Sequence, residues 1–178
     1  MAAFTQPTSV VPAEEAVILP LPEGTVDKTS FSNFLEARVI RLSLDLTADF
    51  ERKVLHGSVT AHVNIVKEGS DVVVLDTRAI SVSSVELLTE EINRSLEFTM
   101  GEAHAAYGSA LRISLPEDCR VAGETHRIRI NYETASGDDC SAVQWLPPEQ
   151  TKGKKHPYLF SQCQAIHCRL FFFYFFSF

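Results

Sequence analysis

The feature that most constrains this chain is an alternation of apolar and polar residues with a period of two. Between residues 40 and 46 the even positions hold Ile, Leu, Leu and Leu, and between residues 59 and 65 the odd positions hold Val, Ala, Val and Ile. Side chains of a strand point alternately to opposite faces, so this pattern is typical of strands with one buried and one hydrated face. We predict two strands there. Because only a short polar break separates them, we expect a hairpin.

Further short segments of the same extended character follow, with turn residues between them. They span residues 72–75, 80–88, 96–100, 111–115 and 128–132. No segment holds a helical period of 3.6 for long, and the one alternative helix, over residues 86–94, fits a strand equally well. The sequence therefore predicts an all-β fold, a mainly antiparallel β-sandwich with little helix.

Charge and hydropathy exclude several classes of partner. The 178 residues carry 16 basic and 23 acidic side chains, for a net charge of -7, which argues against binding to nucleic acid or to an anionic lipid surface. The terminal apolar run is about nine residues, well below the roughly 20 that a membrane-spanning helix needs. We expect no membrane span.

The beginning of the chain does not resemble a targeting sequence. It has no basic region before its first apolar residues, and Glu14 and Glu15 interrupt the apolar portion, so it is not typical of a secretory signal. We therefore expect a cytoplasmic protein. In that compartment the four cysteines are expected to be reduced thiols and not a disulfide framework.

Folding alone does not require the combination of residue types found at residues 141–169, SAVQWLPPEQTKGKKHPYLFSQCQAIHCR. Cys163, His167 and Cys168 lie close together here, with His156 nearby. Their spacing fits no common zinc knuckle, because such sites pair ligands as C-x-x-C. We predict no metal site and expect buried thiols.

Other reactive pairs in the sequence lack the groups that catalysis requires. His56 and His62 share one face of a strand beside Ser and Thr, where histidines usually only titrate. A Cys163–His156 nucleophile pair has neither an oxyanion site nor a third orienting group. The chain contains no H-E-x-x-H, no phosphate-binding loop and no G-x-S-x-G. We predict no catalytic residue and no cofactor, and an enzyme that uses an unrecognised Cys or His site remains the outlying alternative.

Gln162 and Gln164 flank Cys163 and would share one side of an extended segment. Each amide offers two donors and an acceptor, which suits a peptide carbonyl or a peptide amine. From residue type alone, the commoner role of such amides is to satisfy neighbouring backbone groups.

The stretch from residue 141 to residue 169 closely resembles the zinc aminopeptidase family that includes leukotriene A(4) hydrolase and aminopeptidase B (peptidase family M1). Upstream, the VVLDT segment at residues 73–77 and the strand pattern from residue 39 to 65 look like the N-terminal domain of that family. The resemblance covers roughly residues 36–169 and implies a saddle-like assembly of antiparallel strands, incomplete at its C-terminal end.

In that family the N-terminal domain lends a Gln-x-Gln-Ala segment to the rim of an active site that the next domain mostly builds. By resemblance, Gln164 would hold the N-terminal end of a peptide substrate, and Gln162 and Cys163 would line the same wall. The zinc ligands and the G-G-M-E-N segment of the family would lie beyond residue 178. The resemblance therefore implies a substrate-rim domain of a peptide- and epoxide-hydrolysing enzyme, inactive by itself. The alternative is a stand-alone β-sandwich that binds proteins or peptides.

These predictions divide the chain into three parts. Residues 1–33 mix Pro, Ser, Thr and acidic residues and are expected to be a flexible lead-in. Residues 34–169 form the β domain. Residues 170–178 depart from the family in a run of Phe, Leu, Tyr and Ser, which pyrimidine-rich codons specify, so we expect an aberrant Phe-rich tail on a truncated product. Such a run should promote aggregation.

Overall fold

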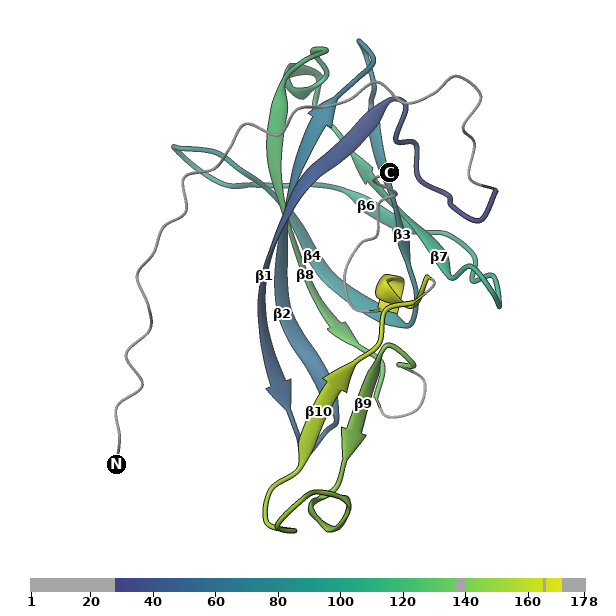
Figure 1. Ribbon diagram of the computed structural model, residues 1–178. Coiled ribbons are helices and arrows are strands. Elements are labelled where there is room, and N and C mark those ends of the chain that lie inside the picture. The colour runs from purple at the N-terminus through teal and green to yellow at the C-terminus, as the bar shows by residue number, and fades with distance from the viewer. Residues whose placement is uncertain (1–27, 137–139, 165, 171–178) are drawn as a thin grey trace.

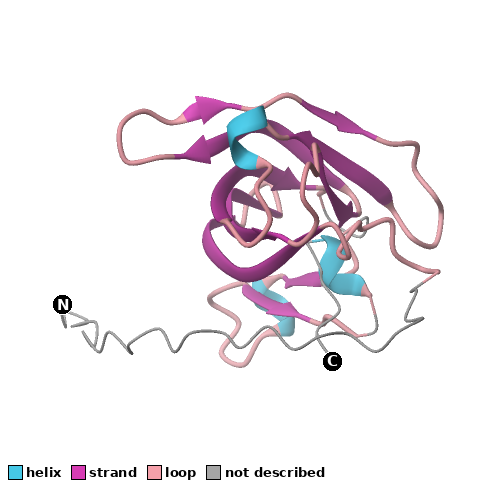
Figure 2. Ribbon diagram, turned by 90° about the horizontal axis from the view of Figure 1, so that it is seen from above, coloured by secondary structure: helices cyan, strands magenta, loops and turns pink. Residues whose placement is uncertain are grey.

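Antiparallel strands make up almost the whole fold, as the sequence predicts. A computed structural model describes residues 28–136, 140–164 and 166–170. The strands are β1 (Ala37–Asp49), β2 (Val54–Ile65), β3 (Val72–Thr77), β4 (Ile80–Leu88), β5 (Arg94–Ser95), β6 (Phe98–Met100), β7 (Ser109–Ser114), β8 (Thr125–Thr134), β9 (Val143–Leu146) and β10 (Tyr158–Ser161). In the described residues the helical elements are short turns, visible in Figure 2, namely η1 (Glu117–Cys119), η3 (Pro148–Gln150) and η4 (His167–Leu170). Residues 86–94 form strand and turn, not a helix.

The strands form two facing sheets and a separate hairpin. A five-stranded sheet has the order β1-β2-β8-β4-β5, and a three-stranded sheet has the order β3-β7-β6. Strands β1 and β2 pair as the predicted hairpin, with Leu44 opposite Val59. In Figure 1 the long strands β1, β2, β4 and β8 curve together, and the β9–β10 hairpin extends beyond their lower ends. The expected β-sandwich is confirmed.

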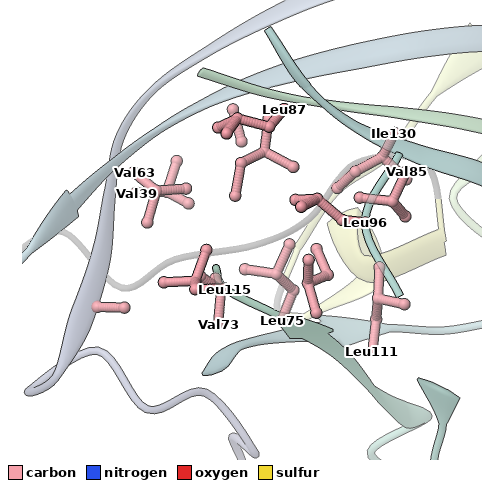
Figure 3. Close-up of a cluster of buried hydrophobic side chains, with 14 of the residues drawn as sticks. Val39, Val63, Val73, Leu75, Val85, Leu87, Leu96, Leu111, Leu115 and Ile130 are labelled. Carbon is pink, nitrogen blue, oxygen red and sulfur yellow. The ribbon is translucent and has the colours of Figure 1, made fainter. Parts of the chain in front are cut away.

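One apolar core lies between the two sheets, and it is built from the residues that alternate in the sequence. Figure 3 shows Val63, Leu87 and Ile130 of the larger sheet facing Leu75 and Leu111 of the smaller one. These side chains are almost completely buried. β-branched and leucine side chains dominate, as expected for a pleated surface that is covered on one side.

A β-bulge in β1 changes which residues of that strand face the core. The pairing register with β2 shifts between Val39 and Arg41. Val39 is buried before the bulge, whereas Leu42 and Leu46 pack against the core after it. Leu44 is 44% exposed, so the predicted apolar face of residues 40–46 is only partly buried. The extra residue in one strand is what reverses the parity of the inward positions.

Residues 30–33 close the outer edge of β3 through side-chain hydrogen bonds. Asn33 Nδ2 donates to the Val72 carbonyl at 2.9 Å, and Asn33 Oδ1 accepts from the Val74 amide at 2.8 Å. The carboxamide thus makes the two hydrogen bonds that the backbone of a neighbouring strand would make to β3. Asp76 accepts from Ser30 Oγ at 2.6 Å and from the Phe31 amide at 2.7 Å. The last residues of the expected lead-in therefore contact the β domain. Most of the lead-in, residues 1–27, and residues 171–178 of the expected tail lie outside the described residues.

In the described ranges, none of the helices is long enough and apolar enough to cross a bilayer.

Candidate functional site

The candidate segment, residues 162–164, follows directly on the β9–β10 hairpin. Tyr158 pairs with Leu146 at one end of this hairpin and Ser161 with Val143 at the other. The Gln162 amide then donates to the Ala142 carbonyl at 2.9 Å. The backbone of Gln162 is therefore held in line with the hairpin.

A second apolar core fixes the hairpin to the end of the larger sheet. It contains Leu55 of β2 with Cys140, Ala142 and Val143, all buried. Trp145 packs edge-on against Phe50 in the β1–β2 turn, with the ring centroids 5.1 Å apart. The hairpin is thus anchored by buried surface and not by its two-stranded pairing alone, which is marginal in water.

The two glutamine side chains are exposed, and the Cys163 side chain between them is half-buried. β10 ends at Ser161, and Gln164 lies in a turn in which its amide faces Gln162 Oε1 at 3.5 Å. The backbone is therefore not extended across residues 162–164. The prediction that both glutamine side chains lie on one side of the segment assumed an extended backbone. Both carboxamides nevertheless remain accessible to a ligand, with donor and acceptor capacity unused.

All four cysteines are free thiols. Burial, followed by the neighbouring Cys163 thiol, raises the pKa of Cys168 to about 12. Burial also raises the pKa values of the Cys119 and Cys140 thiols. These three side chains are therefore poor nucleophiles at neutral pH, because only the thiolate attacks.

The helical turn η4 follows the candidate segment and is tied back to the hairpin. Ser141 Oγ and His167 Nδ1 lie 2.6 Å apart. A serine–histidine contact is also the start of a catalytic triad, but a triad requires a carboxylate that orients the imidazole. The structure gives His167 no such carboxylate contact among the described residues. We interpret this contact as a tether.

Arg169, at the end of the same turn, anchors the segment to the sandwich. Its side chain is completely buried, and Nη2 lies 3.2 Å from Asp76 Oδ2. Nη1 donates to the Thr29 carbonyl at 2.6 Å and to the Tyr107 carbonyl at 3.3 Å. Residues 162–164 are therefore held between two fixed points, the β9–β10 hairpin and this ion pair. The sequence alone did not predict this ion pair, because 93 residues separate its members. The available signal was the charged Asp76 near the end of the buried strand β3.

The other reactive pairs considered in the sequence are not brought together. His156 precedes β10 and Cys163 follows it, so the strand separates them. His56 and His62 lie six residues apart on β2, a separation of about 20 Å. Among the described residues, no group of three His, Cys, Asp or Glu side chains could hold a metal ion.

Comparison with known proteins gives consistent matches over the whole β domain. The peptidase M1 N-terminal domain family matches residues 37–175. Leucine aminopeptidase 2 of Phaeosphaeria nodorum is 39% identical over 143 residues, which cover 80% of this chain and 22% of that protein. The leukotriene A-4 hydrolase homolog of Botryotinia fuckeliana is 35% identical over 147 residues, 82% of this chain and 22% of that protein.

A solved structure has the same fold. Native leukotriene A4 hydrolase from Saccharomyces cerevisiae superposes with a TM-score of 0.72 at 32% identity, over 87% of this chain and 23% of that one. A further yeast structure of that hydrolase, in complex with bestatin, also gives a TM-score of 0.72. The chain thus spans about a fifth of the length of the relatives that it matches.

Proposed function

This chain belongs to the peptidase M1 N-terminal domain family, and on that premise we propose that residues 162–164 form one wall of a site for the N-terminal end of a peptide. Relatives named as leucine aminopeptidases support a peptide substrate. In this proposal Gln164 accepts a hydrogen bond from the peptide ammonium group, and Gln162 and Cys163 line the same wall.

The observation that carries the proposal is the exposure of two carboxamides on a backbone that is fixed at both ends. The Gln162 amide is hydrogen-bonded to Ala142, and η4 is fixed through Arg169. A backbone that is already held in place loses little conformational entropy when a ligand binds, which favours affinity. An ammonium group needs acceptors, and the glutamine carbonyl oxygens supply them without adding charge.

This chain is proposed to bind and not to carry out the chemical step. The family implies a zinc ion, but the described residues do not fit one, because no three potential ligands converge. We therefore derive no hydrolytic step from these residues, whether on a peptide bond or on an epoxide, and propose that the chain is inactive alone. Its cytoplasmic location stays a prediction from the sequence.

Fluorescence anisotropy of a leucine-initiated peptide, labelled at its C-terminus, tests the binding role. The free-amine peptide should bind the full 178-residue chain better than its acetylated form. Gln164→Leu should weaken binding of the free amine about tenfold, the effect of one hydrogen bond to a charged group. Gln144→Leu, at an exposed glutamine of β9, is the matched control and should leave the affinity unchanged.

Two results would contradict the proposal. Equal affinities for the free and acetylated peptides would remove the ammonium from the recognition. Turnover of an aminoacyl anilide by the purified chain with added zinc would show that it carries its own catalytic centre.

A further inference from the structure

The outward face of the larger sheet carries a row of two arginines on either side of a histidine, which the peptide proposal does not use. Arg41 of β1 is the register partner of His62 of β2, and His62 is the register partner of Arg127 of β8. Directly paired side chains on one face of a sheet lie about 5 Å apart. We call these three residues the cationic row. Both arginines are exposed, and the imidazole between them is half-buried.

Nothing in the described part of the chain neutralises the cationic row. The ion pairs there involve other residues, and none of the three side chains makes a hydrogen bond. Burial, then Arg41, then Arg127, lowers the pKa of His62, so both guanidinium groups lie close enough to disfavour a charged imidazole. The two guanidinium groups stand on either side of that imidazole, two inter-strand spacings apart, and no carboxylate of the described residues forms an ion pair with either of them. An anion lying across the imidazole would contact both charges and relieve their mutual repulsion.

The surroundings of the cationic row mark it as a local exception in an acidic chain. The net charge is -7, yet the row has no acidic member. The next row of the same face contains Ser43, Thr60 and Arg129, and Arg129 Nη1 is 3.9 Å from a Glu86 carboxylate. The planar donor fork of arginine and neighbouring hydroxyl groups can bind phosphate oxygens with fixed geometry.

We propose that the cationic row binds a small soluble polyphosphate. The three groups span two inter-strand spacings, about 10 Å, on rigid strands. The ligand must therefore concentrate its negative charge. Each phosphate group carries between one and two charges and several acceptor oxygens, so a chain of two or three phosphates covers the row. An extended acidic peptide presents one carboxylate only about every 7 Å on one side and matches the row less well.

The neighbouring hydroxyls extend the proposed site and an acidic side chain limits it. Ser43, Thr60 and Arg129 line a shallow hollow of about 340 Å³ beside the cationic row. Asp45 lines its far side and would repel an anion that extends further. The ligand is thus expected to lie along the cationic row, across β1, β2 and β8. This site is independent of the β9–β10 hairpin and of the proposed peptide wall.

Isothermal titration of the full chain with sodium tripolyphosphate at low ionic strength tests the proposal. Arg41→Gln and Arg127→Gln should each weaken binding about tenfold or more, since each removes a charge-assisted contact. Arg112→Gln is the matched control, because Arg112 is an exposed arginine of β7 on the other sheet without an ion pair among the described residues. It should leave the affinity unchanged. Arg127→Lys keeps the charge but loses the planar donor fork, and should bind at an intermediate strength.

A second readout does not depend on the ligand. Removing one member of the repelling row should leave the melting temperature of the free protein unchanged or raise it, whereas tripolyphosphate should raise the melting temperature of the unmodified chain. The proposal would be overturned if the chain did not bind tripolyphosphate, or if Arg112→Gln lost as much affinity as Arg41→Gln and Arg127→Gln. Tighter binding of hexaglutamate, or of phosphatidylcholine vesicles with added phosphatidylserine, would also overturn it in favour of an acidic peptide or a membrane surface.

Discussion

Replacing Arg169 with Met should destabilise the folded chain by about 3 kcal/mol, because the substitution leaves the Asp76 carboxylate buried without its cation. Arg169 and Asp76 are 0% and 1% exposed at their side chains. Breaking a buried pair by removing one partner costs about 3–5 kcal/mol, in contrast to the small effect of a solvated pair. A loss of this size is a large fraction of the about 5–15 kcal/mol by which domains are stable.

The structure places the expected loss of stability at the lower end of the range of about 3–5 kcal/mol for a broken buried ion pair. Asp76 keeps its hydrogen bonds from Ser30 Oγ and the Phe31 amide in the variant. In the described part of the chain, Nε and Nη2 of Arg169 find no acceptor with hydrogen-bond geometry, so part of the desolvation cost of the guanidinium disappears with it. Asp76→Asn should cost at least as much, because it leaves a buried cation without a counter-charge.

Urea unfolding followed by Trp145 fluorescence measures the effect. This residue is the only tryptophan, and it packs against Phe50 where the hairpin meets the larger sheet. Arg52→Met is the control: the Arg52–Glu133 contact is shorter, at 2.6 Å, but its side chains are 55% and 36% exposed. Arg52→Met should therefore lower the free energy of unfolding far less than Arg169→Met does.

The double variant Asp76→Asn, Arg169→Met separates the ion pair from general packing. If the pair is coupled as described, the double variant is less destabilised than the sum of the two single variants. Additive losses, or a loss from Arg169→Met no larger than that from Arg52→Met, would refute the reasoning.

Three further predictions concern the sandwich and its thiols. Gly108→Ala should lower the melting temperature by several degrees, because Gly108 has a φ of 80° and an added Cβ would clash with the Thr77 carbonyl oxygen. Ile130→Ala should cost about 2–5 kcal/mol in the same urea assay, since its side chain is 0% exposed in the core between the sheets. The pKa of Cys168 is raised from 9.0 to about 12, so the folded state holds the thiol proton more tightly and stability falls as pH rises across that interval. Urea midpoints of Cys168→Ala should decline less between pH 9 and pH 12 than those of the unmodified chain.

The alternation in the sequence was sufficient to predict most strands of the sandwich, because the period of side-chain direction is a local property of extended backbone. It predicted the β1–β2 hairpin and the inward residues of β2 and β8 correctly. It failed in part at β1, where a bulge between Val39 and Arg41 moves the inward positions from odd to even numbers and where Leu44 is nevertheless 44% exposed. A bulge depends on the partner strand, so the alternation of one strand alone does not reveal it.

For the candidate site, the sequence identified the residues but not their geometry. The Gln162–Cys163–Gln164 pattern stood out by residue type and by family resemblance, and its role in peptide binding stays a prediction. The prediction that both amides lie on one face of a strand assumed an extended backbone. In the structure β10 ends at Ser161, and Gln164 lies in a turn. Where a strand ends is set by the elements that flank it, here the hairpin on one side and η4 on the other.

The sequence by itself determined an antiparallel, β-rich domain, because the pattern of apolar residues fixes which face of each strand avoids water. Only the tertiary structure decided how the sandwich closes, with Asn33 standing in for a strand beside β3 and Arg169 meeting Asp76. It also decided which charges become neighbours, and so revealed the cationic row on β1, β2 and β8. The physical reason is that burial preference is encoded residue by residue, whereas hydrogen bonds and charge pairs depend on distances between residues far apart in the chain.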